Sequence, residues 1–454
     1  MDRDPERDRL TGRVARFAKV GAGLGGAAAT FGVNALFAGG DAQARNAKAL
    51  KETLGQLKGP LMKVAQMFAT VPDLLPPEFA AELAELQTNA PAMTGAFVRR
   101  RMAAELGADW QGRFASFDLT PSAAASLGQV HKATARDGRL LAVKLQYPDM
   151  QSAVESDLAQ LRTVLSLGRQ VFGAIDTSEI VVEISDRIRE ELDYGREAKA
   201  MRLYGDFFEG RDDIAVPRPD PELSTGRLLT MDWLHGRGLI AFKDADLETR
   251  NRVAKTLFEA WWTPLIKLGV IHGDPHLGNY SFTDDFRGQS GAGRLNLLDF
   301  GCIRVFPPSF VGGVVKLFHA MTTGDREAEA AAYRAWGFKG LTDDLMDVLN
   351  IWARFIYGPL LDDRVRTVAD GVAPGEYGRR EAFQVKQALE EKGPVTIPRE
   401  FVFMDRAAIG LGAAFLHLSA EQNWRKLFEA SLEGFSEEAL AARQAEALAA
   451  VGLD

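Results

Sequence analysis

Two acidic motifs close together in the chain constrain its fold more than any other feature. The first, His-Gly-Asp-Pro-His-Leu-Gly-Asn, runs from His272 to Asn279, and the second, Leu-Leu-Asp-Phe-Gly, ends at Gly301. An Asp with an Asn five residues later, followed by Asp-Phe-Gly after an apolar run, is typical of a phosphoryl-transfer site. We therefore expect Asp274 to orient a nucleophile or accept its proton. Asn279 and Asp299 are expected to bind Mg²⁺ on the phosphates of ATP.

A lysine inside an apolar strand adds a predicted phosphate contact. Lys144 lies within Leu-Ala-Val-Lys-Leu, and burying its ammonium group is costly unless an anion meets it. Upstream, Ala-Ala-Ala-Ser-Leu-Gly-Gln-Val-His occupies the place where a protein kinase carries a Gly-rich phosphate loop. Because alanine resists positive φ, we expect this loop to be stiffer than a Gly-rich one. The loop residues that we expect to contact ATP are Ala123, Ala124, Ala125, Ser126, Gln129 and Val130.

With these motifs in this order, the chain resembles the UbiB (AarF-like) family of atypical kinase-like proteins, which includes the mitochondrial coenzyme Q kinase-like proteins. The resemblance runs from about residue 45 to at least residue 320. It implies an α+β fold, namely a bilobal protein kinase-like fold with an α-helical N-terminal extension and a helical C-terminal lobe. In Glu-Leu-Asp-Tyr-Gly-Arg-Glu-Ala, from Glu191 to Ala198, it also implies that Glu197 pairs with Lys144.

The resemblance further implies a regulatory element in the N-terminal extension. The family carries a Lys-x-Gly-Gln motif there, and this chain has Lys63 and Gln66, with Ala65 in place of the glycine. Alanine favours a helix over glycine by about 1 kcal/mol, but it puts a close backbone approach in doubt. Lys63 is expected to meet Glu191 and Asp193. An extension of this kind would occupy the peptide groove of a protein kinase, which argues against phosphorylation of proteins in trans.

The chain divides into four predicted segments: a leader at 1–44, the helical extension at 45–110, a kinase-like N-terminal lobe at 111–230 and a helical C-terminal lobe at 231–454. Amphipathic helices are expected from residue 308 onward, and no Ala-Pro-Glu closes an activation segment. A hinge whose backbone contacts adenine is expected at Met231, Asp232 and Trp233.

The leader combines a basic segment with a charge-free one. The basic residues Arg9, Arg13, Arg16 and Lys19 precede a Gly- and Ala-rich run from Val20 to Gly40. This run reaches the length of about 20 residues that a membrane span needs. Its low hydrophobicity leaves three alternatives, which are surface attachment, a true span and a leader that avoids the membrane. With the family resemblance, we expect a cytoplasmic protein, peripheral at the inner membrane, whose partners include anionic lipid and quinone precursors or quinone-biosynthesis proteins.

Composition excludes several other classes. A chain of 454 residues with 46% hydrophobic content can bury a large core. The net charge of -8, without a basic block, argues against nucleic acid as a partner. A single cysteine, Cys302, cannot form an internal disulfide, and the six histidines show no spacing typical of a structural zinc site.

The leading functional hypothesis is a Mg²⁺-dependent, ATP-binding atypical kinase or ATPase that supports ubiquinone or other isoprenoid-quinone biosynthesis. Its catalytic residues would be Asp274, Lys144 and Glu197. One alternative is a small-molecule phosphotransferase of the aminoglycoside or choline kinase type, which shares the first motif but lacks the alanine-rich loop. Another is an ATP-gated lipid-binding scaffold with little turnover. The phosphoryl acceptor and the oligomeric state stay open at this point.

Overall fold

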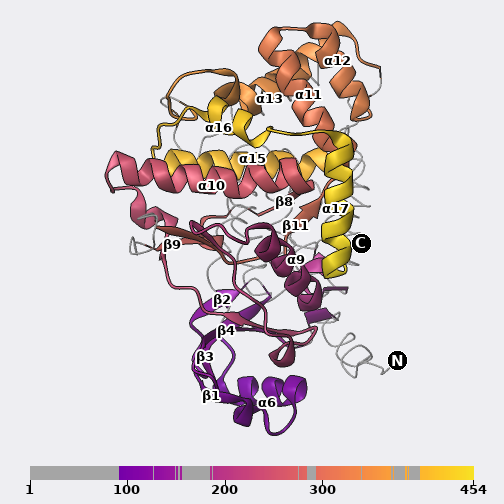
Figure 1. Cartoon of the computed structure of the whole chain (residues 1–454). Coiled ribbons are helices and arrows are strands. Elements are labelled where there is room, and N and C mark those ends of the chain that lie inside the picture. The colour runs from indigo at the N-terminus through magenta and orange to yellow at the C-terminus, as the bar shows by residue number, and fades with distance from the viewer. Residues whose placement is uncertain are drawn as a thin grey trace, which may run out of the picture. The chain divides into compact units, whose positions relative to one another are not determined.

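The computed structural model describes most of the chain from residue 92 onward (Figure 1). The described residues are 92–125, 127–148, 150–151, 154–155, 185–186, 188–274, 276–283, 293–338, 340–369, 372, 384–385, 387 and 399–453. They form two compact units. The first contains the described residues up to Gly195 together with Pro219–Trp233, and the second contains Arg196–Arg218 together with the described residues from Leu234 onward.

In the part that the structure describes, the first unit is an antiparallel sheet with helix α6 packed on it. Strand order is β1-β3-β4-β6, and β2 pairs with β3 at the end of the sheet. The strands are β1 (Phe114–Phe117), β2 (Ala123–Ala125), β3 (Gly128–Ala135), β4 (Leu140–Gln146) and β6 (Leu228–Asp232). The helical segments are α6 (Gly95–Leu106) and the short turns η2 (Trp110–Arg113) and η3 (Pro221–Leu223).

The side chains of β4 alternate between two faces of the sheet. One face packs into the core of this unit, and the other carries Lys144. Leu141, Val143 and Leu145 are fully buried in a cluster that includes Met102 of α6. Successive side chains of a strand point to opposite faces, so Lys144 projects from the face away from this cluster. The predicted apolar strand with one embedded lysine is therefore present, and its lysine lies on the face of the sheet away from α6.

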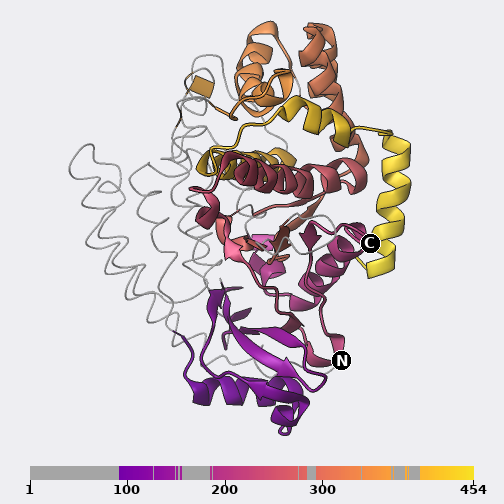
Figure 2. The ribbon, with the colours of Figure 1, turned by 60° about the vertical axis from the view of Figure 1, so that its left-hand side comes forward.

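The second unit is mainly helical (Figures 1 and 2). Its helices are α9 (Tyr194–Phe207, which enters this unit at Arg196), α10 (Leu247–Leu268), α11 (Pro308–Thr323), α12 (Arg326–Ala335), α13 (Asp343–Leu361), α15 (Arg399–His417), α16 (Trp424–Ser431) and α17 (Glu437–Val451). Two small sheets, in the orders β5-β10-β9-β7 and β11-β8, accompany them. The strands are β5 (Ile214–Ala215), β7 (Arg237–Gly238), β8 (Val270–His272), β9 (Tyr280–Thr283), β10 (Arg294–Leu297) and β11 (Ile303–Val305), with short turns at η4 (Leu239–Phe242) and η5 (Leu277–Asn279).

Helix α10 is the central helix of this unit. Asp246 caps its start by accepting a hydrogen bond from the Thr249 amide, and Gly269 ends it in the left-handed conformation with φ 65°. Phe258, Trp262 and most other apolar residues of α10 are buried. Among the described residues after it, helices α11, α12, α13, α15, α16 and α17 agree with the expectation of helices beyond residue 308.

The position of α9 differs from the division expected from sequence. Residues 196–218 group with the second unit, although the sequence suggested one lobe at 111–230. The reason lies in long-range pairing, because β5 runs parallel to β10 with Ile214 opposite Leu295. Such pairing leaves no signal in the local sequence.

Within the described residues, no helix is both long and apolar enough to cross a membrane. The charge-free run from Val20 to Gly40 lies outside the described residues, and the three alternatives for it stay predictions.

Candidate functional site

The first acidic motif begins at the end of strand β8, in the second unit. His272 ends the strand and Asp274 follows in the next turn. Between them, the Gly273 amide donates to the Cys302 carbonyl at 2.9 Å. A Cβ on Gly273 would lie 2.6 Å from that carbonyl oxygen, so only glycine fits this close approach. The two acidic motifs are therefore joined through their backbones.

Asn279 is fixed by its main chain and its side chain. Its amide donates to the His276 carbonyl at 2.9 Å, and its carbonyl accepts from Leu298 at 3.0 Å. The side-chain nitrogen Nδ2 donates to the carbonyl of Asp274 at 2.9 Å and lies 3.5 Å from Oδ2 of the same residue. Because the nitrogen faces Asp274, the oxygen Oδ1 is the atom of Asn279 that can serve as a metal ligand.

Asp299 is held through both its side chain and its main chain. Its carboxylate oxygen Oδ1 accepts from the Gly301 amide at 2.9 Å, and its main-chain carbonyl is hydrogen-bonded to Nε2 of His272. His272 is buried, and its ring lies 6.2 Å from that of Phe300. These contacts of His272 hold the main chain of Asp299 next to the strand that leads to Asp274.

A buried tyrosine lies within the electrostatic reach of both aspartates. Tyr280 is 2% exposed and follows Asn279 directly. Burial raises the pKa of its phenol, and the carboxylates of Asp274 and Asp299 raise this pKa further. The structure therefore brings Asp274, Asn279 and Asp299 around one buried, neutral phenol.

Helix α9 presents its acidic residue on a buried face. Glu197 lies in the first turn and is 2% exposed. Met201 and Tyr204, four and seven residues later, are buried on the same side of the helix. The Tyr204 ring meets the ring of Phe300 edge-on at 5.5 Å. The helix that carries Glu197 thus packs against the Asp-Phe-Gly motif.

In the first unit, Lys144 and its cross-strand neighbours form one face of the sheet. Lys144 is 8% exposed, and its ammonium nitrogen lies 5.1 Å from the centre of the Tyr194 ring. It pairs across the strands with Val130 and with Leu229. Directly opposed residues share a face, so Val130 and Lys144 project on the same side.

The alanine-rich loop is a β-hairpin. Ala123 pairs with Val130, and Ala125 pairs with Gly128. A Cβ on Gly128 would lie 2.4 Å from the Leu145 carbonyl, so this glycine permits close strand contact. Ala123 and Ala124 are exposed strand residues, and the stiffness expected for the loop stays a prediction. Ser126 lies outside the described residues.

The side chain of Gln129 points to the other face of β3. It is buried, its Oε1 accepts from the Met93 amide at 2.8 Å, and its Nε2 lies 2.7 Å from Nε2 of His131. The other ring nitrogen, Nδ1 of His131, lies 2.8 Å from the Asp118 carbonyl. Because both polar ends of this glutamine are used, we leave its side chain out of the proposed nucleotide contacts.

The predicted hinge comprises the last two residues of β6 and Trp233 after it. Its Met231 pairs with Ala142, and the Trp233 amide donates to the Leu140 carbonyl at 2.9 Å. The ammonium nitrogen of Lys132 lies 5.2 Å from the centre of the Trp233 ring. Asp232 forms an ion pair with Arg139 at 3.7 Å. The hinge is thus tied to the sheet, and a contact between its backbone and adenine stays a prediction.

The predicted regulatory residues are only partly described. Lys63 and Gln66 lie outside the described residues. Glu191 is 8% exposed, whereas Asp193 is exposed. Their expected meeting with Lys63 therefore stays a prediction.

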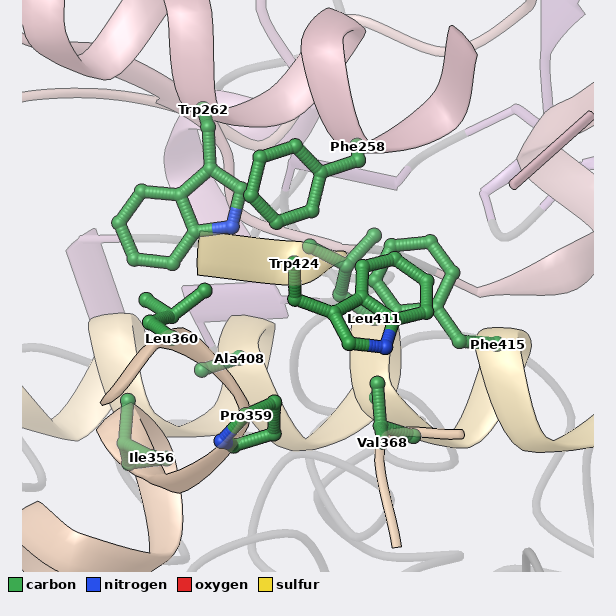
Figure 3. Close-up of a pocket in the computed structure, with 11 residues that line it drawn as sticks. Phe258, Trp262, Ile356, Pro359, Leu360, Val368, Ala408, Leu411, Phe415 and Trp424 are labelled. Carbon is green, nitrogen blue, oxygen red and sulfur yellow. The ribbon is translucent and has the colours of Figure 1, made fainter. Parts of the chain in front are cut away.

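A hollow in the second unit has the wrong chemistry for a nucleotide. It contains about 420 Å³ of space, part of it open to solvent, between α10, α13, α15 and α16. Figure 3 shows Phe258 and Trp262 facing Leu360 and Leu411 across it. The lining side chains are apolar or aromatic, and phosphate groups need charged or hydrogen-bonding partners.

The antiparallel sheet of the first unit, and the arrangement of Asp274, Asn279 and Asp299 in the second, define a protein of the kinase-like class. Over residues 85–332 the chain matches the family model described as the ABC1 atypical kinase-like domain. This match covers more than half of the chain, so the chain belongs to that family. The predicted family and the bilobal α+β kinase-like fold are confirmed.

Relatives include proteins named as atypical kinases. The mitochondrial atypical kinase coq-8 of Caenorhabditis elegans is 30% identical over 70% of this chain and 42% of its own length. The mitochondrial atypical kinase COQ8 of Saccharomyces cerevisiae is 26% identical over 70% of this chain and 64% of its own length. The chain therefore spans roughly half the length of these curated relatives.

A solved structure agrees with the fold. The complex of Rv3197 with erythromycin from Mycobacterium tuberculosis matches with a TM-score of 0.59 and 25% identity. The match covers 85% of this chain and 95% of that one.

Proposed function

We propose that this atypical kinase-like protein binds ATP with Mg²⁺ and transfers the γ-phosphoryl group to water or to a small acceptor. The observation that carries this proposal is the gathering of Asp274, Asn279 and Asp299 around Tyr280 and His272. An acid next to a pair of hard oxygen ligands is the arrangement that phosphoryl transfer requires.

The oxygen ligands fit magnesium better than a structural metal. Among the described residues, no group of three or more His, Cys, Asp or Glu side chains could by itself hold a metal ion. Magnesium usually takes one or two protein ligands and completes its shell with phosphates and water. Asn279, through Oδ1, and Asp299 would hold it, and it would neutralise charge on the phosphates.

The protein's own groups would perform the remaining chemistry. Asp274 orients the attacking hydroxyl or water and accepts its proton. The attacking oxygen bonds to the γ-phosphorus while the bond from that phosphorus to the bridging β-γ oxygen breaks. Lys144, paired with Glu197, aligns the α- and β-phosphates so that attack is in line.

The backbone after Asp299 favours a small acceptor over a protein. Strand β11 begins at Ile303 and helix α11 at Pro308, so the second unit turns into helix almost directly after the Asp-Phe-Gly motif. A protein kinase places its peptide platform in this stretch. We therefore propose that phosphorylation of proteins in trans is not the activity of this chain.

We further propose a role in isoprenoid-quinone biosynthesis at the inner membrane surface. Support comes from family membership and from relatives named as COQ8-type atypical kinases. Under this proposal, the acceptor or regulated ligand is a hydrophobic quinone precursor, presented by anionic lipid.

Nucleotide binding can be tested by thermal stabilisation. ATP with Mg²⁺ should raise the melting temperature of the wild type, since a ligand that binds only the folded state stabilises it. Asp299→Asn should lose the magnesium-dependent part of this shift. The control is Asp244→Asn, because the Asp244 side chain is 87% exposed. An unchanged magnesium dependence in Asp299→Asn would remove Asp299 from its proposed role.

A further inference from the structure

The end of the C-terminal helix α17 is bound to α9, the helix that carries Glu197. The ammonium nitrogen of Lys199 donates to the Gly452 carbonyl at 2.7 Å, and Nη2 of Arg202 donates to the Val451 carbonyl at 3.2 Å. The last carbonyls of a helix have no partner within it, and they attract cations. Figures 1 and 2 both show the end of α17 beside α9.

The middle of α17 is bound to the residues that flank strands β8 and β11, next to both acidic motifs. Nε2 of Gln444, a buried residue, donates to the carbonyls of Leu268 at 2.8 Å and Phe306 at 2.9 Å. Leu268 precedes β8, which leads to Asp274, and Phe306 follows β11. At Gly269, where φ is 65°, an added Cβ would lie 2.3 Å from the Gln444 nitrogen. This contact therefore depends on glycine.

The two cations of α9 lie on the side of the helix away from Glu197. They follow it by two and five residues, which on an α-helix places them across the axis from it. The near side holds Tyr204, whose ring packs on Phe300. Helix α9 is therefore fixed between the Asp-Phe-Gly motif and the end of α17.

We propose that α17 is a positioning element for the nucleotide site, and that Lys199 and Arg202 are the residues through which it acts. By holding the far side of α9, the end of α17 fixes the rotation and the axial position of Glu197. The inference rests on the proposed function, because the role of Glu197 in aligning phosphates is part of it. Neither cation touches the nucleotide in this account.

The test is a full-length double variant, Lys199→Met with Arg202→Met, which keeps the apolar stems and removes both donors. Hydrogen exchange of α9 should become about tenfold faster, since two hydrogen bonds that hold it are lost. The dissociation constant for ATP with Mg²⁺ should rise about tenfold. A charge-conserving pair, Lys199→Arg with Arg202→Lys, should restore both values.

The matched control removes a contact at the opposite end of α17, the end far from α9. Lys316→Met removes the 2.6 Å ion pair to Glu437 at the start of α17, and it should leave α9 exchange and nucleotide affinity unchanged. The proposal is overturned if the double variant binds nucleotide like the wild type, if α9 exchange is unaltered, or if the control variant has the same effect. If the wild type binds no ATP with Mg²⁺, the proposed function fails, and the exchange of α9 still decides whether α17 holds it.

Discussion

Nε2 of His272 is hydrogen-bonded to the main-chain carbonyl of Asp299, which ties the loop of Asp274 to the proposed magnesium ligand. The His272 ring also packs near Tyr280 and Phe300, with ring centres 5.7 and 6.2 Å away. The His272 side chain thus adds to the backbone hydrogen bonds that join the loop of Asp274 to the segment of Asp299.

His272→Phe keeps a ring in this position but removes the hydrogen bond. We expect a loss of about 1–2 kcal/mol in the free energy of unfolding, because the Asp299 carbonyl loses its partner. ATP turnover should fall by about tenfold or more, since misplaced catalytic groups slow phosphoryl transfer. Denaturant unfolding and phosphate release measure the two effects. His319→Phe, which changes an exposed histidine of α11, should alter neither, and wild-type turnover in His272→Phe would contradict the positioning role.

The alanine-rich hairpin gives a prediction about nucleotide affinity. Ala124→Gly or Ala125→Gly should loosen the hairpin, because glycine lacks the Cβ that restricts backbone conformation. We expect altered affinity for ATP, or the appearance of phosphate on the protein itself. Isothermal titration and incorporation of labelled phosphate measure these changes. Equal affinity and no change in incorporation would contradict the idea that stiffness limits this loop.

The buried histidine of β3 gives a prediction about pH. Its Nδ1 donates to the Asp118 carbonyl, so Nε2 can accept from Gln129 only while the ring is neutral. Burial lowers the pKa of His131 below its ordinary value of 6.5, although the Asp118 carbonyl and the nearby carboxylate oppose this shift.

Since the folded pKa lies below the unfolded one, the unfolded chain binds the proton more readily as pH falls below about 6.5. The stability that His131 contributes is therefore fully present above that pH and is lost as pH falls towards the folded pKa. Unfolding followed between pH 7 and 5 should show this loss in the wild type. The loss of stability between pH 7 and 5 should be smaller in His131→Gln. An identical dependence of stability on pH in both proteins would refute the role given to His131.

Two glycines of the first unit should differ in how much stability they lose on substitution by alanine. In Gly128→Ala the new Cβ would meet the Leu145 carbonyl at 2.4 Å, and we expect a cost of about 1–3 kcal/mol from this clash. At Gly226 no atom lies within 4 Å of the position that a Cβ would take, so Gly226→Ala should change stability by less than about 1 kcal/mol. The midpoints of denaturant unfolding compare the stability of the two variants. Equal midpoints would contradict the predicted clash at Gly128.

Local chemistry made part of this site predictable from the sequence. Lys144 stands out because a cation interrupts an apolar strand, and Asp274, Asn279 and Asp299 stand out by spacing. These signals need only a few neighbouring residues. The same is true of the helices after residue 308, whose apolar positions recur at helical spacing.

Long-range contacts explain what the sequence did not reveal. The side chain of Gln129 turns away from Lys144 because strand alternation places it with His131, and its expected role depended on motif position alone. The grouping of α9 with the second unit depends on β5 pairing with β10, and the contacts of Lys199 and Arg202 reach 253 and 249 residues along the chain. Two cations on a helix are usually read as a solvated face, so no local signal marked them.

The most direct test of the central claim is phosphate release from ATP with Mg²⁺ by the wild type and by Asp274→Asn, with and without vesicles that contain anionic lipid. We predict turnover in the wild type, a rise on addition of vesicles and a loss of at least about a hundredfold in Asp274→Asn, since the proton acceptor is removed. Equal turnover in the two proteins, or nucleotide binding without any turnover that depends on Asp274, would contradict the account.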